Sequence, residues 1–414
     1  MNSIETSIVL PTKDSIKVRG VRRRLFAIAP ALPLIIFLAA FFLLPISAIF
    51  FYSIQDDAIS SSLPRTTAII KGWSKGSPLP TDAYEAVVRD LVELNSSGNI
   101  GALSQRVGNE LVGGRAVVIQ TVKKLSAPGS GEQADWQLRL ESAHPAWKQE
   151  AVWSVIANAS GTKGFFYLKW ATDQLDKIDV SGKISSDQGY AFLEMFKRTA
   201  LISLGVTLLT VLLGYPLSYV MVEAKGKWGA ILLLMVLVPF WTSLLVRSMS
   251  WVVLLQSNGV VNMLLQYIGF SDSSIQLLYT RFATVAAMTQ IQLPFTVLPM
   301  YSVMKTIPRT HVRAARSLGA GPLTAHITVF LPQALPGIAA GALLTFILCL
   351  GYYITPALVG GAADQMASYY IARFVNEELN WGLASALSVL LTIAAVLIAI
   401  PLCRQIMRRN GGRI

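Results

Sequence analysis

The stretch from Arg313 to Pro332 reads RAARSLGAGPLTAHITVFLP and is the most informative part of the chain. It is basic and moderately polar, and a strongly apolar segment lies on each side of it. Pro308 suits the start of a helix, and Gly319 can adopt the left-handed conformation that ends one. Gly321-Pro322 can then start a second helix. The sequence therefore predicts two short helices, separated by a break, between two membrane spans.

Composition identifies a membrane protein. Of the 414 residues, 53% are hydrophobic and only 14% are charged, with a mean hydropathy of +0.53. A soluble domain carries about 25% charged residues. Cys349 and Cys403 both lie in apolar segments, and the three histidines show no metal-ligand spacing. We expect no metal and no cofactor bound by this chain.

A membrane-spanning helix needs roughly 20 mostly apolar residues. The first candidate follows Arg22-Arg23-Arg24, as a signal peptide would. Its apolar run is longer than the roughly 7–15 residues of a signal peptide, and no A-x-A cleavage site follows, so we interpret it as a retained helix. Six segments qualify as spans: 26–52, 199–222, 229–254, 282–304, 334–358 and 382–403.

The distribution of charge predicts the orientation, because Lys and Arg are enriched in short cytoplasmic loops. With the N-terminus inside, the inner segments are 1–25, 223–228, 305–333 and 404–414, which hold 16 Lys and Arg against three acidic residues. The long segment 55–198 holds 16 of each sign. The net charge of +12 therefore lies on the cytoplasmic side, both termini included, and does not require a nucleic-acid partner.

Residues 55–198 are too polar to span a membrane and too long for a simple loop. Apolar residues at helical spacing predict helices over 82–94, 146–157 and 165–175. Alternation over Trp136–Leu140 predicts a short strand. We expect a small α-rich domain, with or without a few strands, that serves either as a packed cap on the helix bundle or as a docking platform for a binding protein.

The basic loop 305–333 has the residues of a mechanical contact. Val312, Ala315 and Leu318 are spaced to form one apolar face of a helix, and Arg313 and Arg316 share another. Small residues at 314 and 315 would allow close approach to another protein. Composition alone also fits an ordinary loop that is basic because it is cytoplasmic.

The spacing of this loop resembles the EAA loop of ABC importer permeases, which docks on the ATPase. That pattern is Glu-Ala-Ala, three residues, Gly, nine residues, Ile, one residue and Leu-Pro. Ala314, Ala315, Gly319 and the pair Leu331-Pro332 match it, and Val329 replaces Ile conservatively. Arg313 stands where the family usually has Glu, which affects the polar contact made there.

Further motifs resemble the spermidine/putrescine-type permeases. They are VPFWTSLLVR at 238–247, Leu293-Pro294-Phe295, and GYYITP at 351–356 followed by Gly360-Gly361. The usual members of that subfamily lack a large domain after the first helix. The segment 55–198 is therefore a departure, and it weakens the transfer of a polyamine substrate to this chain.

The resemblance implies an all-α type I permease fold with six spans, in a bacterial inner membrane. It also implies a second permease subunit, identical or different, two copies of a separate ABC ATPase that binds ATP and Mg, and a periplasmic substrate-binding protein. The chain itself would catalyse nothing. The expected parts are a cytoplasmic segment 1–25, a first span within 26–54, a periplasmic domain 55–198, a permease core 199–403 and a cytoplasmic tail 404–414.

The sites follow from the same reasoning. The residues expected to contact the ATPase are Arg313, Ala314, Ala315, Arg316, Gly319, Leu331 and Pro332. Arg247 is an ionisable residue near a span end, where it either lines a polar path or reaches the interface. The prolines of the fourth span and the polar residues at the outer end of the fifth suggest pathway walls. The pathway candidates are Trp241, Arg247, Pro294, Phe295, Tyr352, Tyr353 and Thr355. Gly337 and Gly341 suit close helix packing.

Three other classes of membrane protein fit less well. A secondary transporter or channel should show intramembrane carboxylates or an inverted repeat, and neither is found. A membrane-embedded enzyme needs a nucleophile or metal site, and the sequence offers no HExxH. A receptor built on residues 55–198 would leave the loop 305–333 unexplained.

Overall fold

The structure is a computed structural model in which residues 29–126, 135–161, 164–175, 177–179, 181, 183–184 and 191–410 are described. The chain divides into two compact units, up to Phe51 and from Tyr52 onward. The first contains α2 (Leu32–Leu38), a π-helical turn and most of α3 (Leu44–Ile54). These form one apolar helix of 23 residues, long enough to cross a membrane. The predicted tail 1–25 lies outside the described residues.

The segment that follows α3 is helical, with isolated bridges at Leu111–Ile178 and Ile178–Ile184 among its described residues. The predicted strand at 136–140 is wrong, because these residues begin α9. Asp135 caps that helix by accepting from the backbone N–H groups of Gln137 and Leu138, which favours the helix over a strand. The helices are α4 (Ala58–Ser62), α5 (Pro64–Ile70), α6 (Thr81–Ser97), α7 (Ile100–Glu110), α8 (Gly114–Leu125), α9 (Trp136–Ala143), α10 (Glu150–Asn158) and α11 (Phe166–Ala171).

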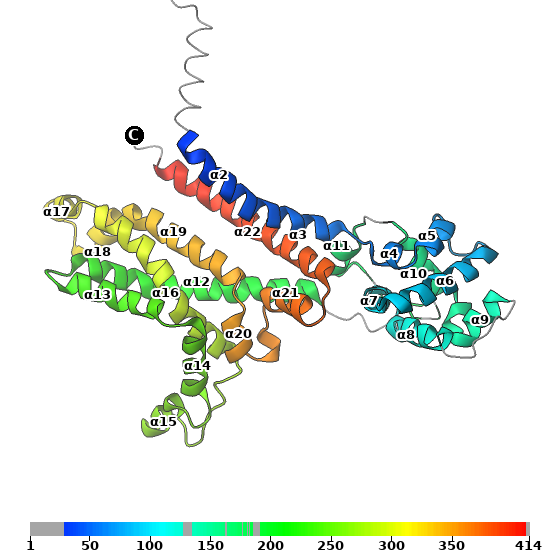
Figure 1. Ribbon diagram of the computed structural model, residues 1–414. Helices are drawn as coiled ribbons and strands as arrows, with labels where there is room; N and C mark the ends of the chain where they lie inside the picture. The colour runs from blue at the N-terminus through cyan, green and yellow to red at the C-terminus, as the bar shows by residue number, and fades with distance from the viewer. Residues whose placement is uncertain are drawn as a thin grey trace, which may run out of the picture. The chain divides into compact units, whose positions relative to one another are not determined.

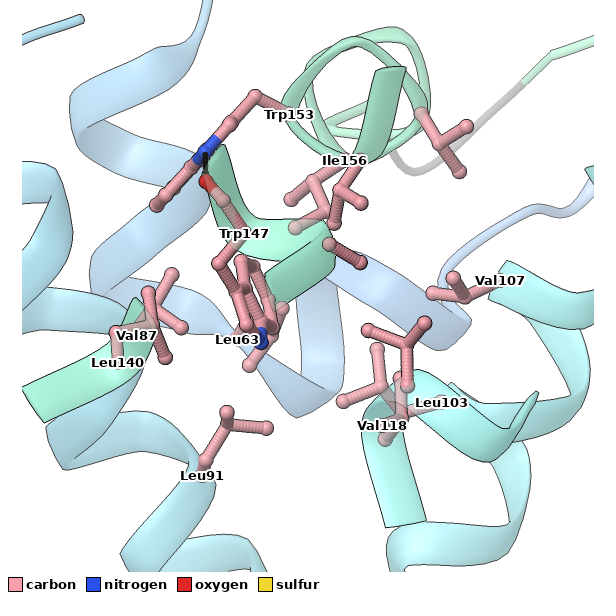
Figure 2. Close-up of a cluster of buried hydrophobic side chains, with 14 of the residues drawn as sticks. Leu63, Val87, Leu91, Leu103, Val107, Val118, Leu140, Trp147, Trp153 and Ile156 are labelled. Atoms are coloured by element: carbon pink, nitrogen blue, oxygen red, sulfur yellow. Dashed lines mark hydrogen bonds between the residues drawn. The ribbon is translucent and has the colours of Figure 1, made fainter. Parts of the chain in front are cut away.

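These helices enclose an apolar core of their own (Figure 2). Trp147 and Trp153 meet edge to face with ring centroids 5.3 Å apart, and the Trp153 indole N–H donates to the Trp147 carbonyl at 3.0 Å. The Trp147 indole donates to Thr121 Oγ1 at 2.9 Å. Both tryptophans are therefore buried with their polar atoms satisfied.

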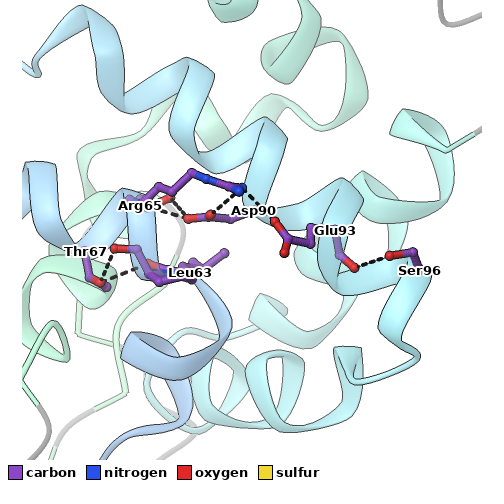
Figure 3. Close-up of polar contacts among 8 residues, drawn as sticks. Leu63, Arg65, Thr67, Asp90, Glu93 and Ser96 are labelled. Carbon is purple, nitrogen blue, oxygen red and sulfur yellow. Dashed lines mark hydrogen bonds and ion pairs between the residues drawn. The ribbon is translucent and has the colours of Figure 1, made fainter.

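A buried carboxylate joins α5 to α6 (Figure 3). Asp90 is 2% exposed and accepts from the backbone N–H and hydroxyl of Thr66 at 2.9 and 2.8 Å. Arg65 reaches both Asp90, at 3.4 Å, and Glu93, at 2.8 Å. The buried Asp90 carboxylate is thus hydrogen-bonded and paired, as a buried charge must be. Its contacts with Thr66 and Arg65 connect α6 to α5.

The remaining helices lie in the region predicted to be the permease core, and their bounds differ from two of the predicted spans. The predicted span 229–254 is interrupted, because Pro239 and the extended residues Thr242 and Ser243 separate α13 from α14. The predicted span 334–358 ends at Leu350, and a break precedes α20. The helices are α12 (Phe192–Glu223), α13 (Trp228–Leu237), α14 (Leu244–Leu255), α15 (Val260–Tyr267), α16 (Arg281–Thr306), α17 (Arg309–Ser317), α18 (Pro322–Ala325), α19 (Leu331–Leu350), α20 (Ile354–Val359), α21 (Ala367–Asn376) and α22 (Trp381–Asn410).

Five helices of the described chain are long and apolar enough to cross a membrane. Besides the first, they are Phe192–Glu223, Leu244–Tyr267, Pro322–Leu350 and Trp381–Pro401. The continuous helix α16 is more polar, and the apolar stretch Trp228–Trp241 is shorter than a span. The count of six spans stays a prediction.

The long helices α12, α16 and α19 pack against one another (Figure 1). Gly337 and Gly341 are buried on α19, and a Cβ added to Gly341 would lie 2.6 Å from the Thr296 carbonyl oxygen on α16. Thr296 and Thr345 share a hydroxyl hydrogen bond of 2.5 Å in the same contact. The predicted role of the two glycines in close helix packing is confirmed.

Candidate functional site

The loop between α16 and α19 consists of two short helices and a glycine turn, as the sequence predicts. α17 ends at a Schellman motif: the Ala320 N–H donates to the Ala315 carbonyl and the Gly319 N–H to the Arg316 carbonyl, both at 3.1 Å. Gly319 has φ +90°, a conformation that favours glycine. Gly321 then precedes α18, which continues through π-helical residues into α19. The turn thus fixes how α17 leads back to α19.

An aromatic cluster holds the second half of the loop. His326 shares a hydrogen bond of 2.6 Å with the Tyr215 hydroxyl on α12. Its ring meets the Tyr219 ring edge to face at 4.7 Å and stacks on Phe330 at 5.2 Å. α18 is therefore tied to α12 as well as to α19.

Polar contacts hold the first half. Arg309 donates to the Val222 carbonyl at 2.9 Å and lies 3.8 Å from Glu223, at the end of α12. His311 bonds Gln333 at 2.9 Å, and Gln333 donates to the Val329 carbonyl at 2.7 Å. Arg309 and His311 both lie in the first turn of α17, so this end of the helix is connected to α12 and to α19, and a displacement of α17 would move them.

The outward surface of the loop is apolar and basic. Leu318 is 89% exposed and Leu323 is 71% exposed, and Ile327 is exposed as well. The predicted apolar face is therefore only partly correct: Val312 packs against the core of Met300, Met304, Phe330 and Ala334, but Leu318 does not. Its exposure results from the turn, which carries the last residue of α17 away from the bundle.

Two arginines of α17 add positive charge beside these leucines. Arg313 and Arg316 are exposed and form no ion pair within the described part of the chain. Both line a pocket of about 240 Å³ below α17, together with Glu223 and His326. Ala314 is exposed between them, and Ala315 is half-buried. Leu331 and Pro332 lie at the start of α19.

Three of the predicted pathway residues come together between α14 and α20. Thr355 is buried and shares a hydrogen bond of 2.8 Å with Ser248, next to Arg247 in the chain. Thr355 also lies 3.4 Å from the Tyr352 hydroxyl, and Arg247 acts on the same hydroxyl electrostatically. The Nε of Arg247 is buried with no hydrogen-bond partner in the described structure.

The other pathway candidates are dispersed. Phe295 meets Phe240 edge to face at 5.0 Å, which joins the stretch after α13 to α16. Pro294 is buried inside α16, whereas Trp241 is 73% exposed and Tyr353 is exposed. The structure therefore places these four residues outside the group around Arg247.

Sequence reasoning missed polar residues inside the bundle. Gln292 is 1% exposed and Thr289 is 6% exposed, and each has a side-chain oxygen with no partner among the described residues. Both lie on α16. Their spacing in the sequence shows no periodic pattern that would single them out. Polar residues such as Thr and Gln also occur inside helix bundles, where they form hydrogen bonds between helices.

Sequence reasoning also missed a buried ionic group within residues 55–198, called the inserted segment below. Arg106 on α7 is 3% exposed and binds Asp56 with two nitrogens, at 2.8 and 2.9 Å. It also binds Glu110 at 3.1 Å, and its guanidinium lies 3.4 Å from the centre of the Phe166 ring. The Arg106 and Glu110 spacing of four residues on an amphipathic helix was the available signal.

Burial at this group shifts two titrations. It raises the pKa of Tyr167 to about 12, assisted by the negative charge of Asp56. It also raises the pKa of the Glu110 carboxyl above its ordinary value, against the attraction of Arg106. The group is therefore a structural junction whose charges depend on one another.

Residues 199–409 match the family of binding-protein-dependent transport system inner membrane components. The chain is 32% identical over 203 residues to the spermidine/putrescine transport system permease protein PotB of Escherichia coli (strain K12), covering 49% of this chain and 74% of PotB. It is 31% identical over 202 residues to the inner membrane ABC transporter permease protein YdcU of the same organism, covering 45% and 61%. A solved bacterial ABC transporter that imports alginate shares 19% identity with a TM-score of 0.43, covering 59% and 88%.

Proposed function

The chain belongs to the family of binding-protein-dependent transport system inner membrane components and is a permease subunit of an ABC importer. On that premise we propose that residues 305–333 couple this subunit to a separate ATPase. The observation that carries the proposal is the exposed surface of Leu318, Leu323 and Arg313, on a loop tied to α12 and to α19. Leu318, Leu323 and Ile327 are exposed together on one short loop, and a group of exposed apolar side chains rimmed by charge is typical of a protein-binding surface.

The coupling is mechanical. ATP binding by the partner would displace α17, and the contacts of Arg309 and His326 with α12 would pass that displacement to the bundle. The Schellman turn at Gly319 keeps α17 and α18 at a fixed angle, so the loop moves as a lever. Arg313 and Arg316 would meet acidic residues of the ATPase, in place of the contact that a glutamate makes in the usual EAA pattern.

The rest of the assembly follows from the family. We infer a second permease subunit, two ATPase copies that bind ATP and Mg, and a periplasmic binding protein. The solute is a small polar compound, with a polyamine or a related amine or amino-acid-like compound favoured by the similarity to PotB. The group around Arg247 would lie along the solute's path, and residues 55–198 would face the periplasm with both termini in the cytoplasm.

The test replaces Gly319 by valine. A β-branched residue at φ +90° is strained, by roughly 1–2 kcal/mol or more, so the turn and the exposed leucine beside it should be displaced. Gly226 is the matched control, because it has φ +60°, open space around it and a place in another short loop. Both variants are reconstituted with the ATPase and binding protein in proteoliposomes, and ATP-driven uptake and ATPase association are measured.

We expect Gly319→Val to insert normally, to bind the ATPase weakly and to lose uptake. Gly226→Val should transport at close to the wild-type rate, since it carries a similar strain elsewhere. Equal uptake by the Gly319 variant and the wild type would refute the coupling role of the loop. Equal loss in both variants would show that strain, rather than position, is responsible.

A further inference from the structure

A second pocket lies at the junction between the inserted segment and the start of α22. It has a volume of about 480 Å³, within the range of roughly 300–1,000 Å³ that small-molecule sites occupy. Its walls come from the end of α3, from α4, α7 and α11, and from residues 379–382. Gln105 donates to the Glu378 carbonyl at 2.6 Å and fixes the two sides of the junction to each other. The pocket is thus a built feature of the fold.

The charge around the pocket is negative. Asp57 lines it and accepts one hydrogen bond, from Gln55 at 2.6 Å. Arg106 also lines it, but its charge is already met by Asp56 and Glu110. At and beside the pocket there are therefore one guanidinium and three carboxyl groups, and the net charge stays negative even with Glu110 protonated. A cation entering the pocket would be attracted, while an anion would be repelled.

The remaining walls suit an organic cation rather than a metal ion. Tyr52, Tyr167 and Trp381 line the pocket with aromatic side chains, a residue class whose ring faces attract ammonium groups. Asn109 also lines the pocket, and its amide nitrogen is buried without a partner among the described residues. An amide nitrogen without an internal partner is available to donate to a polar group of a ligand. No group of three metal-ligating side chains occurs in the described chain.

We propose that this pocket binds an organic ammonium group, with Asp57 as its counter-ion and Trp381 and the two tyrosines around its carbon-bearing side. The ammonium can belong to a free amine or to an ethanolamine lipid headgroup, because both present the same chemistry. The site goes beyond the transport function proposed above, since it needs neither the coupling loop nor the ATPase. It would let an amine in contact with the outer face act on α22.

The experiment uses the full chain with its partner permease in nanodiscs. Spermidine binding is measured by calorimetry in discs of phosphatidylglycerol alone, and retention of phosphatidylethanolamine is measured by native mass spectrometry in mixed discs. The variants are Asp57→Asn and Trp381→Ala. Their matched controls are Asp82→Asn, an exposed aspartate on α6, and Trp228→Ala, an exposed tryptophan on α13.

Asp57→Asn should weaken the affinity for the ammonium ligand by about tenfold or more, as loss of a charge-assisted hydrogen bond does. Trp381→Ala should weaken it about threefold, as expected of an exposed cation–π contact. The controls should leave binding unchanged. A loss confined to spermidine identifies a free amine, and a loss confined to phosphatidylethanolamine identifies a lipid; either supports the site. Absence of binding by both, or equal binding by wild type and both pocket variants, would overturn it.

Discussion

Replacing Gly382 by alanine tests whether the inserted segment is fixed to the permease core. Gly382 lies in the first turn of α22, directly against the ring of Tyr167 on α11. A Cβ at this position would overlap the ring, with Cδ2 of Tyr167 only 2.6 Å away. Tyr167 cannot simply turn aside, because it is 8% exposed and meets Phe166 edge to face at 5.2 Å. Either the ring or the helix must move.

The magnitude follows from what moves. A small shift of the ring is an overpacking cost of about 1–3 kcal/mol. Expulsion of the ring would forfeit its burial, and about 150 Å² at about 25 cal/mol per Å² amounts to about 4 kcal/mol. The loss should be local to the cluster that joins α11 to α12, α21 and α22. We therefore expect a local destabilisation of about 2–4 kcal/mol.

Hydrogen exchange in the purified full chain measures this directly. The amides of α11 and of the first turns of α22 should exchange about 30-fold to 1,000-fold faster in Gly382→Ala, since each 1.4 kcal/mol is a factor of ten. Gly101→Ala is the control, because an alanine there meets nothing within 4 Å. Unchanged protection of α11 in Gly382→Ala would mean that the junction is looser than its contacts indicate, and the rigid connection would be refuted.

The loop 305–333 was the most predictable part of this protein. Its turn depends on local chemistry, a glycine after a helix and a Gly-Pro before the next, so the Schellman motif could be anticipated at Gly319. The exposure of Leu318 could not. Helical spacing grouped it with Val312, but the turn at Gly319 ends the helix there, and the side chain leaves the face that Val312 buries.

The spans were harder to predict where the chain breaks inside apolar sequence. Pro239 and Gly351 interrupt predicted spans, yet Pro294, Pro299 and Pro336 lie within continuous helices. Hydropathy cannot separate these cases, because the neighbours that satisfy the freed carbonyls come from elsewhere in the fold. Similarly, the alternation of apolar and polar residues over Trp136–Leu140 predicts a strand, but a run of five residues also fits the first turns of a helix, and Asp135 caps α9 there.

The connection of the inserted segment to the core depends on contacts far apart in sequence. Asp173 accepts from the backbone N–H groups of Phe192 and Leu193, at 2.9 and 2.8 Å, and so caps α12 from outside the helix. Tyr167 and Trp170 then share one apolar cluster with α21 and α22. These contacts are those expected of a segment packed on the helix bundle, and the docking role stays a prediction.

Two further predictions concern packing and pH. Gly341→Ala should destabilise the full chain in detergent by about 1–3 kcal/mol, because the added Cβ meets the Thr296 carbonyl. The control Gly205→Ala, which has open space around it, should be neutral or stabilising. Equal melting temperatures for the two variants would contradict the close α16–α19 contact. Burial raises the pKa of Glu110, so the folded state binds its proton more tightly and the contribution of this residue to stability falls as pH rises from 4.5 through the raised pKa. Glu110→Gln retains the neutral form, and its stability relative to wild type, measured by hydrogen exchange of α7, should therefore increase with pH across that window; a difference that is flat or decreases would show that the pair with Arg106 outweighs burial.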